Sequence, residues 1–225
     1  MKTFTLTTPA GVVFHVRPHS KDCETVFYYW IHGEPVYNVK GLSIPDNSVI
    51  IDIGAHIGTV SLRMATAAKN VKVYAFEPFP ENFALLKKNI CENNLDKVIT
   101  PYKLAISNIN RKRNLFTCTE RTDGHTFYKH KDFKFGKAIN VNCITLPEFL
   151  SKEKIKQVEF LKIDAEGAEY DIFLEGDISF LDKVKKIGME CHPCHPKYKA
   201  SDIVRVLRKK GFQVIDEDGE LFAKK

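Results

Sequence analysis

Short apolar runs alternate with segments that carry apolar residues at helical spacing along most of the chain. Runs of strand length lie at 49–53, 71–76, 98–106, 139–144, 158–163 and 184–190. Helical spacing predicts helices at about 58–69, 80–93, 146–152, in a segment that ends near 176, and at 201–210. The runs 212–215 and 220–223 predict a closing hairpin. Because strands alternate with helices, we expect an α/β fold with a mostly parallel sheet and helices on both faces.

The first 44 residues do not follow this alternation. Apolar residues flank Pro9-Ala10-Gly11 on both sides, which predicts a β-hairpin with a turn. The aromatic run 27–31 is a second strand candidate. We therefore divide the chain into a small N-terminal β extension, residues 1–44, and a main domain, residues 45–225. We expect the extension to pack on the main domain.

Residues 110–137 interrupt the alternation with a basic and aromatic segment, which we interpret as an inserted hairpin or loop. Its lysines interleave with its aromatic residues: Lys129, Lys131, Lys134 and Lys137 among Phe127, Tyr128, Phe133 and Phe135. Bases can stack on aromatic rings while lysines contact phosphates, so the segment could bind RNA. The same pattern fits a hairpin with one apolar and one charged face.

The sequence from Val49 to Gly58, VIIDIGAHIG, joins a strand to a helix through a loop that contains glycine. Such loops hold nucleotide-like ligands, because glycine permits tight turns and the helix N-terminus offers unpaired N–H groups. Counted from Gly54, the dinucleotide motif G-x-G-x-x-G has His56 and Thr59 in place of its second and third glycines. The loop therefore disfavours a nicotinamide or flavin dinucleotide. Its spacing, D-x-G-x-x-x-G, resembles the first motif of methyltransferases that use S-adenosylmethionine (AdoMet).

The next strand, 71–76, is followed directly by Glu77. A carboxylate at the end of the second strand can accept hydrogen bonds from two ribose hydroxyls. Taken separately, the glycines fit a tight turn and Glu77 fits a solvated strand end. Loop, helix, strand and terminal acid in this order favour a ligand that contains a ribose, such as AdoMet.

The bulk composition is that of an ordinary globular protein. The 225 residues are 44% hydrophobic and 28% charged, and the net charge of +6 only weakly indicates an anionic partner. No apolar run approaches the ~20 residues of a membrane helix, and the N-terminal sequence lacks the apolar core of a signal peptide. We expect a cytoplasmic protein with no membrane partner. The six scattered cysteines predict free thiols rather than a disulfide framework.

Acidic residues and a histidine follow two of the predicted strands. Asp164 and Glu166 come after one strand, and Glu190 and His192 lie at the end of another. The carboxyl ends of parallel strands meet at the ligand crevice of an open α/β sheet, so we expect these side chains there. His192 is our candidate general base for a hydroxyl acceptor, with Asp164 and Glu190 as the alternatives.

Carboxylates with a histidine could also hold Mg²⁺ or another divalent cation, but we do not favour a metal and assign no metal ligands from the sequence. Glu166 and Glu169 also suit the first turn of a helix. The segment Cys191–His195 spells C-x-x-C-H, a pattern of haem attachment and of zinc-ligand types. Without a second ligand pair or an export signal, we interpret it as a loop with incidental thiols.

Three stretches resemble the FkbM-type methyltransferases: IDIGAHIGTVSL (51–62), YAFEPFPENFALLKKNI (74–90) and FLKIDAEGAEYDIF (160–173). The segment IGMECHP (187–193) matches a less distinctive strand end of that family. The resemblance implies the class I methyltransferase fold, a Rossmann-like, mostly parallel sheet of seven strands. It also implies AdoMet-dependent O-methylation of sugar or natural-product hydroxyls, although family membership alone does not fix the substrate.

The residues expected to bind AdoMet lie at strand ends and in the loops after them: Asp52, Gly54, His56, Gly58, Glu77, Asn82, Ala105, Ile106 and Asp164. By the resemblance, Asp52, Gly54 and Gly58 would face the methionine end and Glu77 the ribose. Ala105 and Ile106 would neighbour the adenine, and Asp164 the sulfonium. We expect His56 to shape the pocket rather than to catalyse.

We therefore interpret the chain as an AdoMet-dependent methyltransferase that acts on a hydroxyl of a sugar or small metabolite. An exocyclic base nitrogen is disfavoured, because the segment 164–167 reads D-A-E-G where such enzymes carry [N/D]-P-P-[Y/F]. Two alternatives stay open. An RNA methyltransferase would bind RNA through residues 110–137 in a salt-sensitive way. A non-catalytic binding module with the AdoMet fold would not bring Asp164 and His192 to the ligand.

Overall fold

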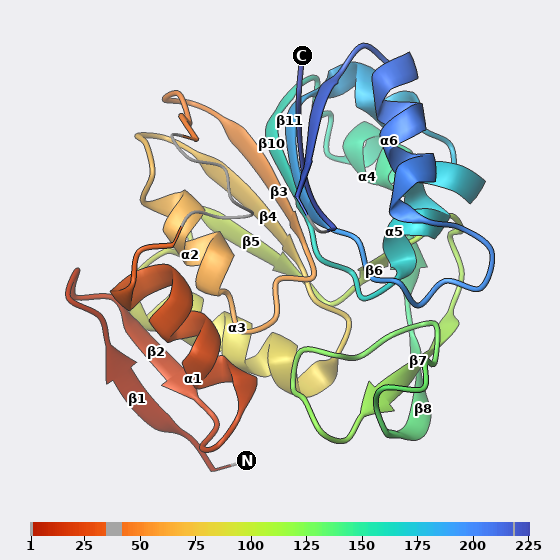
Figure 1. Cartoon of the computed structure of the whole chain (residues 1–225). Helices are drawn as coiled ribbons and strands as arrows, with labels where there is room; N and C mark the ends of the chain where they lie inside the picture. The colour runs from red at the N-terminus through yellow and green to blue at the C-terminus, as the bar shows by residue number, and fades with distance from the viewer. Residues whose placement is uncertain (1, 35–41, 218) are drawn as a thin grey trace.

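A seven-stranded sheet forms the centre of the computed structural model, which describes residues 2–34, 42–217 and 219–225 (Figure 1). In spatial order its strands are β12 (Gln213–Glu217), β13 (Glu220–Lys224), β11 (Val184–Glu190), β10 (Val158–Ile163), β3 (Val49–Ile53), β4 (Lys72–Phe76) and β5 (Ile99–Tyr102). Strands β5, β4, β3, β10 and β11 run parallel, whereas β13 is antiparallel to both of its neighbours. The predicted α/β fold with a mostly parallel sheet of seven strands is confirmed.

Helices cover both faces of this sheet (Figure 1). On one side lie α1 (Lys21–Val26), α2 (Thr59–Ala65) and α3 (Pro80–Glu92), and on the other lie α4 (Leu146–Lys152), α5 (Ala168–Tyr170), η4 (Ser179–Lys183) and α6 (Ala200–Lys209). Ile51 and Ile53 of β3 belong to the core under α4–α6, whereas Ile50 belongs to the core under α2 and α3. Successive side chains of a strand point to opposite faces, so the isoleucines of β3 serve both cores.

Capping residues explain where the predicted helices begin. The Oγ1 of Thr145 accepts a hydrogen bond from the Glu148 N–H at 3.4 Å, and Pro147 lies in the first turn of α4. This helix occupies the predicted residues 146–152. The helix predicted to end near 176 is instead divided into α5 and the π-helical turn η3 (Asp171–Glu175). The helix predicted at 58–69 ends earlier, at Ala65.

The N-terminal segment contains the predicted hairpin, formed by β1 (Phe4–Thr7) and β2 (Val13–Val16). The prediction of a strand at 27–31 is wrong, because these residues form a π-helical turn, η1 (Phe27–Ile31), that continues α1. Trp30 provides the physical reason. Its Nε1 donates a hydrogen bond to the Thr59 carbonyl oxygen at 2.9 Å, and its ring packs edge-on against Phe14. These tertiary contacts override the strand propensity of the aromatic run.

The N-terminal segment packs on the main domain, as expected. Phe14, Val16 and Val26 belong to the same buried cluster as Ile50 of the central sheet. The Oδ1 of Asn89 in α3 accepts a hydrogen bond from the His15 N–H at 2.7 Å, which joins β2 to α3. The segment therefore shares a core with the sheet, and the division of the chain at residue 44 stays an interpretation of the sequence.

The run 98–106, predicted as one strand, is two strands in the structure. β5 stays in the central sheet, whereas β6 (Ala105–Ile106) leaves it to pair with β9 (Cys143–Ile144). Pro101 has no N–H to donate, which suits β5 to the sheet edge. The insert forms a hairpin of β7 (Arg113–Cys118) and β8 (Phe135–Val141), as predicted. No helix in the described part of the chain is long and apolar enough to cross a membrane.

Candidate active site

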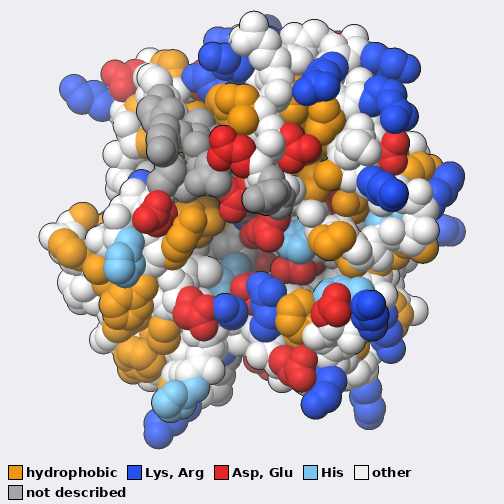
Figure 2. Space-filling view, in the orientation of Figure 1, with side chains coloured by type: hydrophobic (Ala, Val, Ile, Leu, Met, Phe, Trp, Pro, Cys, Tyr) orange, Lys and Arg blue, Asp and Glu red, His pale blue; other side chains and the backbone are white. Residues whose placement is uncertain are grey.

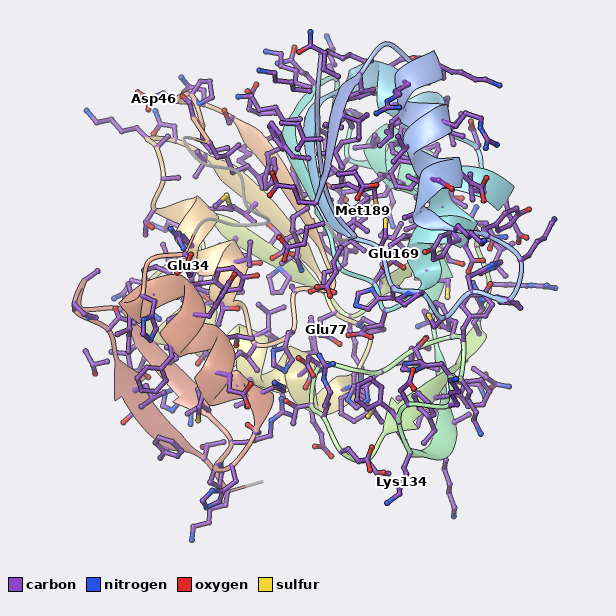
Figure 3. The ribbon with its side chains drawn as sticks, viewed as in Figure 1. Glu34, Asp46, Glu77, Lys134, Glu169 and Met189 are labelled. Carbon is purple, nitrogen blue, oxygen red and sulfur yellow. The ribbon has the colours of Figure 1, made fainter. Side chains whose placement is uncertain are left out.

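A cavity with an empty volume of about 590 Å³ opens at the carboxyl ends of the parallel strands. Its walls come from the ends of β3, β4 and β10, from β6 and from the insert. Of the residues predicted to bind the cofactor, all except Asp52 and Gly58 line it: Gly54, His56, Glu77, Asn82, Ala105, Ile106 and Asp164. Figure 3 shows Glu77 at this end of the sheet, between the N-terminal segment and the insert.

Two glycines shape the loop after β3. Gly54 has a φ of +76°, and a Cβ built on it would lie 1.7 Å from the carbonyl oxygen of Asp164. The loop therefore passes directly against the end of β10, where only glycine fits. Gly58 has a φ of +95°, and its Cβ would lie 2.8 Å from Leu86 Cδ1. Contrary to the prediction, Gly58 is outside the cavity wall, and close packing of the loop against α3 requires it.

Asp52 lies beneath the loop and, contrary to the prediction, does not line the cavity. It is fully buried, 3.0 Å from the Nζ of Lys162, and it accepts a hydrogen bond from Ser61 Oγ at 2.5 Å. The register of β3 and β10 places Asp52 beside Lys162. Lys162 also donates to the carbonyl oxygen of Gly54 at 2.6 Å. This buried ion pair fixes the glycine loop to the sheet.

Glu77 presents its carboxylate at the cavity wall after β4. Its Oε2 accepts a hydrogen bond from the His56 N–H at 2.9 Å, and its Oε1 accepts one from the Phe79 N–H at 2.8 Å. Burial raises the pKa of Glu77 to about 7, although these N–H groups and His56 act in the opposite direction. Each oxygen keeps a lone pair, so the fixed carboxylate can accept two hydroxyl hydrogen bonds.

His56 and Asn82 connect the cavity to the N-terminal segment. His56 Nε2 lies 3.1 Å from Asp22 Oδ1, and Asn82 Oδ1 accepts a hydrogen bond from the Arg17 guanidinium at 2.7 Å. Arg17 also donates two hydrogen bonds, each of 2.8 Å, to the fully buried Asp22. Burial alone would raise the pKa of Asp22, but hydrogen bonds with His56 and Arg17 hold it well below its ordinary range. The contacts of Arg17 and Asp22 with the site could not be predicted from the sequence, because no motif links these residues to the glycine loop.

The wall formed by β6 and the insert is mostly apolar and includes Ala105, Ile106 and Phe127. His125, which the sequence analysis missed, also lines it. Its Nδ1 accepts a hydrogen bond from the Cys118 N–H at 3.0 Å, and its Nε2 is buried without a partner among the described residues. Burial, together with the charges of two nearby basic side chains, lowers the pKa of His125 to about 4. The ring is therefore neutral with the proton on Nε2, a donor that suits a purine nitrogen.

His192 is the centre of a second group of side chains at the same edge of the sheet. Its Nδ1 lies 2.6 Å from Oε1 of Glu169, which is fully buried on α5. Its Nε2 faces carboxylate oxygens of Asp164, Glu166 and Glu190 at 3.7, 3.5 and 3.5 Å. The structure thus brings together the predicted catalytic residues Asp164, Glu190 and His192. Figure 2 shows acidic and histidine side chains gathered around a hollow near the centre of this face.

The carboxylates of this group shift the pKa of His192. Burial would lower the pKa of His192, but Glu169, followed by Glu166 and Asp164, raises it well above its ordinary value. The raised pKa favours the protonated imidazole, which donates a proton rather than accepting one. The role of His192 as the general base stays a prediction. Burial also raises the pKa of Glu166, to about 8, and that of Glu190.

The C-x-x-C-H segment and the insert both make contacts with other parts of this chain. Cys191 and Cys194 are free thiols, and neither belongs to the group of side chains with metal-ligand spacing found in the described ranges. In the insert, the Phe127 ring lies 4.0 Å from the Arg113 guanidinium, and the Tyr128 hydroxyl donates to Asp171. The four interleaved lysines are exposed. This arrangement matches a hairpin with one apolar and one charged face.

Comparison with protein-family models matches residues 52–214 to the methyltransferase FkbM domain. Methyltransferase 1 of Beauveria bassiana (strain ARSEF 2860) is 25% identical, over 77% of this chain and 75% of that protein. The 31-O-demethyl-FK506 methyltransferase FkbM of Streptomyces tacrolimicus is 24% identical, over 97% of this chain and 92% of that protein.

The crystal structure of methyltransferase FkbM from Methylobacillus flagellatus KT superposes with a TM-score of 0.57 and 16% sequence identity. The match covers 90% of this chain and 51% of that one, so this chain spans about half the length of that structure. At this level of identity the likeness supports the fold, in agreement with the order and directions of the strands.

Proposed function

The chain belongs to the FkbM methyltransferase family, and we propose that it transfers the methyl group of AdoMet to a hydroxyl group of a sugar or another small metabolite. Family membership makes the chain a methyltransferase, because the family model covers residues 52–214. That span includes the glycine loop, Glu77 and the strand ends around the cavity. The hydroxyl acceptor is the part that we add.

Glu77 is the observation on which the proposal chiefly depends. Two backbone N–H groups fix its carboxylate in the cavity wall, with lone pairs left for two ribose hydroxyls. The neutral Nε2 of His125, among apolar residues, suits the edge of an adenine. Asp164 places a carboxylate at the other side of the cavity, where it would favour a sulfonium. The residues present therefore fit AdoMet.

Bound AdoMet would supply a methyl group that is already activated as an electrophile. The residues of this chain then have mainly to hold the acceptor oxygen in line and to receive its proton. Asp164 lines the cavity and is positioned to accept that proton. Glu77 would orient the donor together with Asn82 and His56, which the N-terminal segment holds in place.

Two observations support a hydroxyl acceptor. The segment 164–167 lacks the [N/D]-P-P-[Y/F] motif of enzymes that methylate exocyclic base nitrogens. The Streptomyces relative is named for a 31-O-demethyl substrate, in which the missing methyl belongs on an oxygen. An RNA substrate has less support, because aromatic side chains of the insert pack against this chain instead of facing solvent.

Incubation with AdoMet and separate panels of sugars, hydroxylated metabolites and RNA would test the proposal. We expect mass spectrometry to find a methylated hydroxyl compound, with S-adenosylhomocysteine formed in equal amount. The double variant Lys129→Gln/Lys134→Gln should leave this transfer unchanged. Methylation of RNA that is lost in the double variant, or no transfer to any hydroxyl by a chain that binds AdoMet, would contradict the proposal.

A further inference from the structure

We propose that Asp164, Glu190 and His192 form a binding site for a divalent metal cation beside the cavity. Their carboxylate oxygens and the His192 imidazole nitrogen all lie within 4.8 Å of one another. His192 Nε2 is 3.7 Å from Asp164 Oδ1 and 3.5 Å from Glu190 Oε1. These separations exceed the roughly 2.7–3.2 Å of a direct hydrogen bond. Ligands about 2.1 Å from one ion lie about 3.0–3.5 Å apart as neighbours, so the spacing leaves room for an ion between them.

The orientation of His192 is the one that metal-bound histidines require. Its Nδ1 lies 2.6 Å from Oε1 of Glu169, so Nε2 is directed at the other carboxylates. Glu169 is fully buried, which holds the imidazole ring in place. Histidine ligands commonly donate their second ring N–H to a carboxylate in this way. Glu169 is thus a positioning residue for the site.

Glu166 provides an independent observation that points to a cation. Its side chain is only 10% exposed, and its Oε1 is 3.5 Å from His192 Nε2. Its carboxylate accepts no hydrogen bond from the described residues. Arg121 is 4.0 Å away and already makes two hydrogen bonds to Asp123. Burying an ionised carboxylate that accepts no hydrogen bond costs folding free energy. A cation between the surrounding groups would stabilise the ionised form.

The local charge supports the same inference. Four carboxylates, those of Asp164, Glu166, Glu169 and Glu190, surround one imidazole on a chain whose overall charge is +6. One imidazole can offset the charge of only one of these carboxyl groups, and a bound cation would favour the ionised form of the others. A divalent ion would balance the excess and would leave coordination positions open toward the cavity, which Asp164 lines.

The ligand types indicate the class of ion. Two carboxylates and one imidazole suit Mn²⁺ or Zn²⁺, whereas Ca²⁺ prefers six to eight oxygen ligands. A hydroxyl oxygen bound at an open position would lose its proton more readily, because the ion acts as a Lewis acid. That role rests on the proposed O-methyl transfer, whereas binding of the ion does not.

Titration of the chelator-treated chain with Mn²⁺, followed by electron paramagnetic resonance, tests the site. We expect saturable binding of one equivalent. Glu169→Gln should weaken binding about 10- to 100-fold, as is typical when a residue that orients a ligand is changed. Glu190→Gln, which removes a ligand on a partly exposed side chain, should weaken it by about 100-fold or more. Circular dichroism would verify that each variant is folded.

Glu220→Gln is the matched control, because Glu220 pairs with Glu190 in the register of β11 and β13 but lies outside the ligand group. Unsaturable Mn²⁺ binding, normal binding in Glu190→Gln, or an equal loss in Glu220→Gln would overturn the site. Calorimetric titration with AdoMet separates the two proposals. A chain that binds Mn²⁺ but not AdoMet contradicts the proposed function alone, and one that binds AdoMet but not Mn²⁺ contradicts the metal site alone.

Discussion

At the scale of single residues, close backbone approaches and buried charges define the cavity. Gly54 is required because the loop touches the carbonyl oxygen of Asp164. Glu77 is fixed by two backbone N–H groups, and Asp52 forms a buried ion pair with Lys162. The surrounding chain fixes each of these positions. A substitution at one of them therefore tests a single contact.

Gly54→Ala should destabilise the fold by roughly 3 kcal/mol or more, because a positive φ and a severe clash act together. Gly11→Ala is the matched control: Gly11 has a φ of +79°, but a Cβ there would meet nothing within 4 Å. It should lose only about 1–2 kcal/mol from the left-handed conformation. Urea unfolding of both variants measures the difference. An equal loss of unfolding free energy in both variants would show that the loop does not pass close to the Asp164 carbonyl oxygen.

AdoMet affinity should fall as pH decreases below about 7, the value to which burial raises the pKa of Glu77. The ionised carboxylate accepts ribose hydroxyls better than the protonated form, so binding favours loss of the proton. If only the ionised form binds, the Kd rises about fivefold from pH 7 to pH 6, because the ionised fraction falls from about one half to about one eleventh. Glu77→Gln should bind more weakly at pH 7 and lose most of this pH dependence. Calorimetric titration at several pH values measures the Kd of both proteins. The same dependence of Kd on pH in both would contradict the role of Glu77.

Motif spacing identified Gly54, Glu77 and Asp164 correctly as cavity residues, because loop and strand ends have local signatures. It could not find His125, Arg17 or Asp22. Their contacts join positions far apart in the sequence: Arg17 meets His56 and Asn82 only after the N-terminal segment docks. Asp52 was misplaced for a related reason, since its partner Lys162 belongs to a strand more than 100 residues later.

At the scale of elements, the N-terminal segment is part of the site rather than a separate cover. The turn after β2 and the start of α1 supply Arg17 and Asp22, which hold His56 and Asn82. The insert meets the same group, because Thr122 Oγ1 donates to Asp22 at 3.0 Å. Three segments therefore depend on one buried carboxylate.

Asp22→Asn should reduce the free energy of unfolding by about 3–5 kcal/mol, because it leaves a buried Arg17 without its charged partner. It should also weaken AdoMet binding, since His56 loses its support. Glu24→Gln in the same helix breaks only the exposed Lys21–Glu24 pair and should change stability by about 1 kcal/mol at most. Chemical denaturation compares them, and similar losses would contradict the buried network.

Elements with long apolar runs and clear boundaries were predicted with their observed bounds, as for 158–163, 184–190 and 146–152. Other segments have structures that depend on distant contacts. Pairing with β9 draws residues 105–106 away from the sheet, although the apolar run suggests one strand. Trp30 likewise directs 27–31 into a helical turn by bonding to Thr59.

At the scale of the whole molecule, the strand order places every predicted site at one edge of the sheet. β3 and β4 bring the glycine loop and Glu77, and β10 and β11 bring the carboxylates around His192. The N-terminal segment and the insert lie on either side of this end of the sheet (Figure 1). This arrangement puts the donor pocket next to the acidic side chains around His192, where an acceptor could be held in line with the methyl group.

Calorimetric titration of the pure chain with AdoMet, S-adenosylhomocysteine and NAD tests whether the cavity binds AdoMet. We predict micromolar binding of the first two ligands, none of NAD, and a marked loss of AdoMet affinity in Glu77→Gln with an unchanged fold. An absence of AdoMet binding, with Mn²⁺ present as well as without it, would contradict the account and leave the loop at Gly54 as only a turn between β3 and α2.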